Sequence, residues 1–187
     1  MYKSVLFFAV MFVLGISFLP AQNNPALDTI INNFGARNYS SARITKAELD
    51  LIVQAGLRAP SAGNRQPWHF TVVQNETLAR QILSQVTEGN VLLVISGAGD
   101  NKTNGVVVLD CALATQNIYL AAQALGLGSR IYTAPIDNIN SRFKSELGLP
   151  SGHNAVALVR IGKLPAGVDA VSSASARSGA DQKVTYK

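Results

Sequence analysis

Residues 106–125 constrain the fold of this 187-residue chain more than any other stretch. Their apolar side chains cover nearly the whole circumference of a helix, which is typical of a helix buried on all sides. We therefore predict a central core helix over 106–125, ended by Gly126 and Gly128. Cys111, the only cysteine, lies inside this helix, so we expect it to pack in the core and not to act as a thiolate.

Amphipathic helices and short apolar strands surround this helix in the sequence. Helical spacing predicts helices over 26–34, 46–58, 76–86 and 138–147, the second opened by a capping box from Thr45 to Glu48 and the last capped by Asp137. Apolar runs predict strands over 70–73, 91–96, 131–133 and 155–161, and a final strand over 184–186. Because helices and strands do not alternate strictly, we expect an α+β fold and not a doubly wound sheet.

The N-terminal residues have the pattern of an export signal. Lys3 precedes an uncharged apolar run over 5–19, and Leu19-Pro20-Ala21 offers a cleavage site. The run is shorter than the roughly 20 residues of a membrane-spanning helix. We predict a signal peptide over 1–21, a single domain over 22–187, and an exported protein, periplasmic or secreted, without stable membrane association after cleavage. An uncleaved anchor is the alternative, because Leu19 is less usual than Ala at that position.

The rest of the composition excludes several classes of protein. Although the net charge is +5, the basic residues are scattered and carry no aromatic stripe, so we expect no nucleic-acid binding. Neither His69 nor His153 has carboxylates at ligand spacing, so no metal site is predicted. There is no Gly-x-Ser-x-Gly elbow and no dinucleotide-binding fingerprint after a strand. If the chain is an enzyme, a cofactor carries its chemistry.

Residues 59–70, with the sequence APSAGNRQPWHF, form a small polar loop between a predicted helix and a predicted strand. Pro60 disfavours helical backbone at Ala59 and so ends the helix. The small residues that follow let backbone amides approach a ligand, and Ser61, Asn64 and Gln66 carry hydrogen-bonding side chains. The simpler interpretation is an ordinary helix-to-strand connector.

This loop resembles the flavin-contacting loop of the nitroreductase family. Two further stretches resemble the same family: 110–128 its long central helix, and Arg177 with 184–186 its terminal basic residue and tail. Arg37 matches the last basic residue of the family's N-terminal Arg-x-Ser-x-Arg-type element. Together these stretches span nearly the whole chain that follows the predicted signal peptide.

The resemblance implies a central, mostly antiparallel sheet flanked by helices in an intertwined homodimer, with FMN at the interface. It implies ping-pong hydride transfer from NAD(P)H to nitro, quinone or similar acceptors, in which no side chain acts as acid or base. We therefore name cofactor contacts and no catalytic residue. Arg37 and Arg177 are expected to hold the phosphate and ribityl end. The flavin-lining residues, from the other subunit, are expected to be Pro60, Ser61, Asn64 and Gln66.

The chain departs from the family pattern in two places. Asn33 and Gly35 replace the upstream Arg and Ser of the N-terminal element, which removes half of the usual phosphate cluster. Residues 97–105 are too few for the cover found in many relatives, so we expect an open active site. The alternative function is therefore an exported protein of the same fold that has lost flavin and acts as a binding module. A third is another flavin chemistry, such as dehalogenation or flavin destruction.

Overall fold

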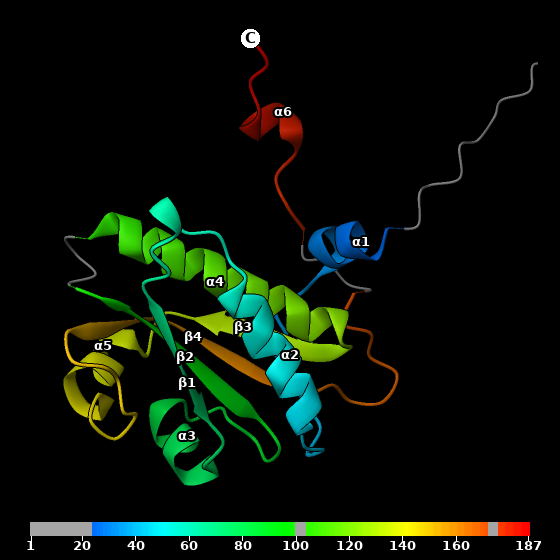
Figure 1. Ribbon diagram of the computed structural model, residues 1–187. Coiled ribbons are helices and arrows are strands. Elements are labelled where there is room, and N and C mark those ends of the chain that lie inside the picture. The colour runs from blue at the N-terminus through cyan, green and yellow to red at the C-terminus, as the bar shows by residue number, and fades with distance from the viewer. Residues whose placement is uncertain (1–23, 100–103, 172–175) are drawn as a thin grey trace, which may run out of the picture.

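The computed structural model describes residues 24–99, 104–171 and 176–187. At its centre is a four-stranded antiparallel sheet in the order β1-β2-β4-β3 (Figure 1). The strands are β1 (Trp68–Val73), β2 (Val91–Ala98), β3 (Leu127–Tyr132) and β4 (His153–Lys163). The helices are α1 (Pro25–Asn32), α2 (Lys46–Leu57), α3 (Glu76–Ile82), α4 (Gly105–Ala124), α5 (Ile136–Asn138) and α6 (Ala180–Lys183), with a 3-10 turn η1 (Ala62–Asn64) and a π-helical turn η2 (Ile139–Phe143). The predicted α+β class is confirmed, while the predicted signal peptide over 1–21 lies outside the described residues.

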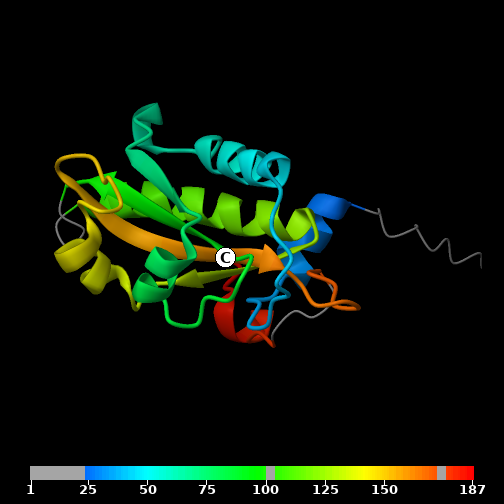
Figure 2. The ribbon, with the colours of Figure 1, turned by 90° about the horizontal axis from the view of Figure 1, so that it is seen from below.

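Helices cover both faces of the sheet (Figure 2). On one face, α2 and α4 contribute Ile52 and Ile118 to an apolar core that includes Leu93 of β2. On the other face, α3 and η2 contribute to a second core that includes Leu92 of β2. Successive β2 residues therefore point into different cores, which explains why the predicted strand over 91–96 is apolar without alternation.

Helix α4 is the long central helix that its sequence predicts, but it is not buried on all sides in a single chain. Asn104 caps its start by accepting a hydrogen bond from the Val107 N–H (3.3 Å), and Gly126 follows its end with a φ of +73°. Its sheet-facing residues, Cys111 among them, are buried, but an outward stripe of Val106, Leu109 and Leu113 is 47%, 60% and 37% exposed. A single chain therefore leaves one apolar face of α4 uncovered.

Three local predictions are wrong. Gly128 does not help to end α4 but lies in β3, opposite Gly162 of β4. Asp137 caps no helix: it lies inside α5, and the chain continues as η2 in place of the predicted helix over 138–147. The strand predicted over 184–186 does not form, because no strand of the described chain lies beside it to pair with.

The capping box of α2 is confirmed and is tied to the sheet. Thr45 Oγ1 accepts from the Glu48 N–H (3.2 Å), and Glu48 accepts from the Thr45 N–H (2.9 Å) and from Lys163 Nζ of β4. The hydrogen bond from Lys163, followed by those from Thr45, outweighs partial burial and lowers the pKa of Glu48. This carboxylate therefore stabilises the fold above its unfolded pKa, and the contribution is lost as the pH falls through the lower folded pKa.

We expect Lys163→Met to lower the free energy of unfolding by about 1 kcal/mol at pH 7, because the ion pair to Glu48 is lost while the apolar stem is kept. At pH 3 the difference from the wild type is expected to shrink, since Glu48 is then protonated in the unfolded chain. Urea unfolding at both pH values measures it. An equal difference at pH 7 and pH 3 would contradict this role of the ion pair.

Candidate functional site

The loop over 59–67 leaves α2 and enters β1 in a fixed shape. Ser61 Oγ accepts from the Gln66 N–H (3.0 Å), and Gln66 Nε2 donates to Asn64 Oδ1 (3.1 Å). Asn64 and Gln66 have φ values of 53° and 49°, in the left-handed region that Asn tolerates and Gln rarely adopts. Strained backbone of this kind clusters at ligand sites, where the loop shape is set before the ligand arrives. Three of the four predicted flavin-lining residues thus contact one another within this loop.

Asp110 attaches this loop to the N-terminal half of α4. Its side chain is only 3% exposed, and Oδ1 accepts from the backbone N–H of Ala62 (3.0 Å). The sequence suggests a helix cap or dipole partner at Asp110, but Asn104 is the cap of α4. That interpretation is wrong, because α4 begins a turn earlier than Asp110 and leaves its carboxylate free to hold the loop.

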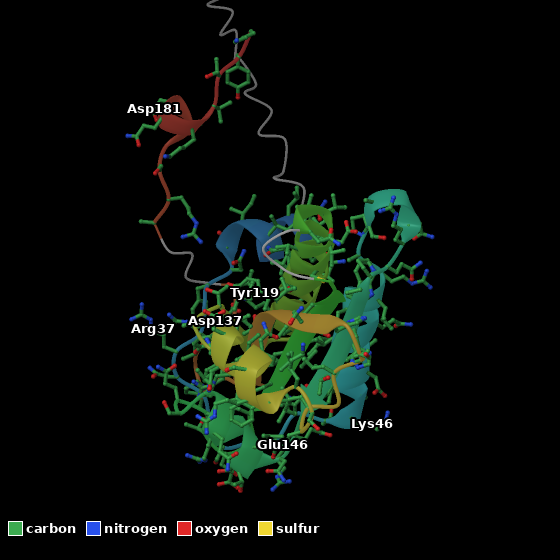
Figure 3. All side chains as sticks on the ribbon, turned by 90° about the vertical axis from the view of Figure 1, so that its left-hand side faces the viewer. Arg37, Lys46, Tyr119, Asp137, Glu146 and Asp181 are labelled. Carbon is green, nitrogen blue, oxygen red and sulfur yellow. The ribbon has the colours of Figure 1, made fainter. Side chains whose placement is uncertain are left out.

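The segment that carries Arg37 is attached to the opposite end of α4. Gln123 pairs with the backbone of Phe34: its Oε1 accepts from the Phe34 N–H (3.2 Å), and its Nε2 donates to the Phe34 oxygen (3.1 Å). The Ala36 N–H donates to the Ser129 oxygen of β3 (3.0 Å). Arg37 follows directly, is exposed, and points away from the body of the protein (Figure 3).

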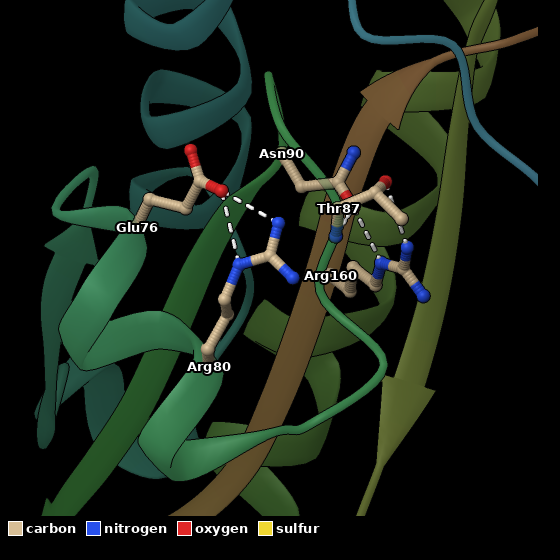
Figure 4. Close-up of polar contacts among 5 residues, drawn as sticks. All are labelled: Glu76, Arg80, Thr87, Asn90 and Arg160. Carbon is tan, nitrogen blue, oxygen red and sulfur yellow. Dashed lines mark hydrogen bonds and ion pairs between the residues drawn. The ribbon is translucent and has the colours of Figure 1, made fainter.

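A buried arginine, Arg160, packs against Tyr39 and so helps to fix this segment. The guanidinium of Arg160, 2% exposed, lies 4.1 Å from the ring centre of Tyr39. It donates to Asn90 Oδ1 (2.7 Å) and Thr87 Oγ1 (3.2 Å), as Figure 4 shows. The hydroxyl of Tyr39 in turn donates to the oxygen of Ala36 (3.2 Å). Burial raises the pKa of Tyr39 well above its ordinary value, so this hydroxyl remains a donor and fixes the backbone beside Arg37.

Arg37 and the loop do not meet within one chain. Asp110 and Gln123 are 13 residues apart on α4 (123 minus 110), so the two attachment points lie about 20 Å apart along the helix axis. In Figure 1 the η1 turn lies beside the N-terminal end of α4 and α1 beside its C-terminal end. The structure therefore brings together Ser61, Asn64 and Gln66, but it holds Arg37 at a separate place.

Arg177 lies on the C-terminal tail, which extends beyond the rest of the protein (Figure 1). Its Nη1 donates to the oxygen of the neighbouring Ala176 (3.3 Å), and its side chain is exposed. In α6 and the residues after it every side chain is exposed. The tail thus brings Arg177 into no described contact with the loop or with Arg37.

The described residues hold little machinery for acid–base or thiol chemistry. Burial, and secondarily the charge of Asp110, raises the pKa of the Cys111 thiol to about 12, so it stays protonated at neutral pH. Within ranges 24–99, 104–171 and 176–187, no group of three or more His, Cys, Asp or Glu residues is arranged to hold a metal ion. The site offers hydrogen bonds and positive charge, which suit the binding of an anionic cofactor.

Comparison with known proteins decides the family. A family model described as the nitroreductase family matches residues 36–93 and 85–163. The chain belongs to the nitroreductase family. A putative NADH dehydrogenase/NAD(P)H nitroreductase of Archaeoglobus fulgidus is 33% identical over 145 residues, which cover 73% of this chain and 83% of that protein.

Solved nitroreductases share the fold. A nitroreductase with bound FMN from Bacteroides fragilis aligns with a TM-score of 0.72 and 22% identity, over 88% of this chain and 99% of that one. Nitroreductase A from Vibrio parahaemolyticus aligns with a TM-score of 0.75 and 23% identity, over 87% of this chain and 75% of that one. Helix α4, the sheet and the loop all fall within the matched residues, whereas Arg177 and 184–186 lie beyond the family match.

Asn33 and Gly35, which replace the upstream Arg and Ser of the family pattern, have structural uses. Asn33 Nδ2 donates to the Ile30 oxygen (2.6 Å), and Asn33 Oδ1 accepts from the Tyr119 hydroxyl (3.0 Å). Gly35 forms a parallel bridge with Ser129 of β3. Both positions therefore join the N-terminal segment to α4 and the sheet and supply no charge.

Sequence reasoning missed the residues that position this site. Asp110 and Gln123 are polar residues in a strongly apolar helix, and that contrast is the signal that could have found them. Arg160 gives a similar signal as a charge within the apolar run 155–161 of strand β4. Tyr39 gives none, since its ring partner, Arg160, comes from the distant strand β4.

Proposed function

We propose that this nitroreductase-family chain is an FMN-dependent oxidoreductase that works as a homodimer and passes hydride from NAD(P)H to nitro, quinone or similar acceptors. The name of the Bacteroides fragilis structure records bound FMN, and that of the Archaeoglobus fulgidus protein records NAD(P)H nitroreductase. The observation that carries the proposal is the division of the site between the two ends of α4.

A two-fold pairing along α4 would complete this divided site. The outward stripe of Val106, Leu109 and Leu113 gives each chain an uncovered apolar face at the middle and start of the helix. If two copies pair along α4 in antiparallel orientation, with the two-fold axis near residues 116–117, the Asp110 end of one α4 lies beside the Gln123 end of the other. The loop of one copy then meets the Arg37 segment of its partner, and the interface and the site form together.

The residues at the two ends fit the parts of FMN. Arg37 and Arg177 can each offer a planar guanidinium, which binds a phosphate oxygen pair well. Ser61, Asn64 and Gln66 offer short polar groups on a preformed loop, and Pro60 offers an apolar edge for the flavin ring. When bound, FMN supplies the capacity to accept and return a hydride. The protein needs only to bind and orient it, in agreement with the inert Cys111 thiol.

The absorbance spectrum of the purified protein tests this proposal first. We expect a yellow protein, or one that becomes yellow with added FMN, together with FMN-dependent NAD(P)H oxidation in the presence of a nitro or quinone acceptor. A colourless protein that takes up no FMN would rule the proposal out.

Arg177→Ala is expected to weaken FMN binding by about 1.5–3 kcal/mol, since a hydrogen bond to the charged phosphate is lost. Titration of FMN fluorescence measures the dissociation constant, and Arg37→Ala is expected to act in the same direction. Arg142→Ala serves as the matched control, because Arg142 is an exposed arginine on η2 that contacts Phe143. Equal dissociation constants for the wild type and Arg177→Ala would contradict this placement of the phosphate.

We also propose that the protein is exported, periplasmic or secreted, on the pattern of residues 1–21. Mass spectrometry of the protein recovered from its native cells is expected to find a chain that begins at Gln22. A chain that retains residues 1–21 would favour the uncleaved anchor.

The second candidate function is a flavin-free binding module of the same fold. It is favoured by Asn33, whose side chain is used within the chain and brings no charge to the phosphate end. Tight FMN binding together with NAD(P)H oxidation would exclude this candidate.

A further inference from the structure

The only two histidines of the chain meet at one end of the sheet, although they are far apart in sequence. His69 lies near the start of β1, His153 begins β4, and Ser96 of β2 lies between them. The ring centroids of the two histidines are 6.3 Å apart, with the ring planes at 88°. Ser96 is fully buried, and its small side chain leaves room for both imidazoles to approach each other across the middle strand.

The hydroxyl of Ser96 determines which nitrogen of His153 carries the proton. Ser96 Oγ donates to the backbone oxygen of His69 (3.3 Å) and lies 3.4 Å from Nδ1 of His153. A hydroxyl has one proton, so when Ser96 Oγ donates to the His69 oxygen it accepts from Nδ1–H of His153. Nε2 of His153 then has a free lone pair, the form in which imidazole binds a metal.

The two rings lie close enough to share an ion after a small movement. An imidazole nitrogen lies about 2.0–2.1 Å from Zn²⁺, so two rings that bind one ion have centres roughly 6.4 Å apart when the ion lies in line between them and roughly 5.2 Å apart at a tetrahedral angle. The observed centroid distance is 6.3 Å, so a tetrahedral ion needs the rings to approach by about 1 Å. His69 is exposed and His153 is half-buried, so rotation of the His69 side chain can bring the rings into a bent arrangement around an ion.

We propose that His69 and His153 form a binding site for a divalent transition-metal ion of the kind that prefers imidazole: Zn²⁺, Ni²⁺ or Cu²⁺. These three ions share imidazole as a favoured ligand, whereas Mg²⁺ and Ca²⁺ prefer oxygen. Among the described residues no third His, Cys, Asp or Glu joins the pair. Water therefore completes the coordination, and the site is open and exchangeable, unlike a structural zinc centre with four protein ligands.

A substitution at Lys144 is expected to change the metal affinity in the opposite direction to substitutions of the histidines. Its Nζ donates to Asn154 Oδ1 (3.1 Å), beside His153, and its positive charge acts against a bound cation. Removal of this charge is expected to strengthen metal binding, whereas removal of either imidazole weakens it. A non-specific association of metal with the protein surface would not follow this pattern.

The experiment is calorimetric titration of the purified protein with ZnCl₂ and, separately, NiCl₂. The wild type is expected to bind one ion per chain, and His69→Gln and His153→Gln each to lower the affinity at least tenfold. Lys144→Gln is expected to raise the affinity threefold or more. Mg²⁺ serves as the control ion and is expected to produce no saturable heat. Wild-type and His153→Gln proteins with equal affinities would overturn the proposal.

Thermal unfolding gives a second readout that does not depend on heat of binding. A ligand that binds only the folded state raises Tm by mass action, so Zn²⁺ is expected to raise the Tm of the wild type and not that of His153→Gln. The metal-free Tm of each variant shows that it is folded. Light scattering distinguishes binding within one chain from bridging between chains, and one ion per two chains would also overturn the proposal.

Discussion

Replacement of Leu109 by Glu is expected to produce a folded monomer that no longer retains FMN. Leu109 is 60% exposed in one chain and lies between Val106 and Leu113 on the outward stripe of α4. The proposed two-fold pairing along α4 would bury a carboxylate from each chain in an apolar interface, without a partner of opposite charge. We expect the dimer to weaken at least a thousandfold, about 4 kcal/mol, and FMN binding to be lost with it.

Light scattering after size-exclusion chromatography measures the oligomeric state, and flavin absorbance measures the cofactor. Leu51→Glu is the matched control, because Leu51 is a leucine of similar exposure, 52%, on another helix, α2. That variant is expected to remain a flavin-binding dimer. If Leu109→Glu also remains one, or if Leu51→Glu disrupts the dimer equally, the proposed pairing along α4 is wrong. Circular dichroism shows whether each variant is folded.

Sequence reasoning found the elements whose signal is contained within their own residues. The apolar circumference of α4, the continuous apolar run of β2 and the capping box at Thr45 each report a local pattern, and the structure confirms all three. The sequence does not predict the turn over 136–143, because its apolar spacing is helical while its backbone passes from the short helix α5 into the π-helical turn η2. Periodicity does not distinguish these two backbones.

The candidate site was predictable only in part, because its arrangement depends on contacts between distant residues. The loop residues Ser61, Asn64 and Gln66 could be named from their chemistry and from resemblance to a family. Their attachment to Asp110 joins residues 48 positions apart, and the Gln123–Phe34 pair spans 89 positions. No local pattern encodes such a pairing. The sequence likewise gives no sign that His69 and His153 meet, since strand order alone brings them together.

Gly162→Ala is expected to destabilise the protein by about 3 kcal/mol, because the side chain of Tyr39 occupies the space over this glycine. A Cβ at residue 162 would lie 2.6 Å from Tyr39 Cδ1 and closer still to Asn90 Nδ2. Gly128, opposite on β3, forms the other wall of this slot, since a Cβ there would lie 3.1 Å from Tyr39 Cε1. Tyr39 must therefore move, which weakens its contacts with the Arg160 guanidinium and the Ala36 oxygen.

Urea unfolding measures the loss, and Tm is expected to fall by roughly 10 °C for a chain of this size. Gly105→Ala is the matched control: no atom lies within 4 Å of a Cβ at that position, and alanine is the better helix former at the start of α4. That variant is expected to be as stable as the wild type or more so. Because Tyr39 also fixes the backbone beside Arg37, Gly162→Ala is expected to weaken FMN binding under conditions where the variant is still folded. Full FMN affinity in a folded but destabilised Gly162→Ala protein would show that the packing of Tyr39 stabilises the fold but does not determine the position of Arg37.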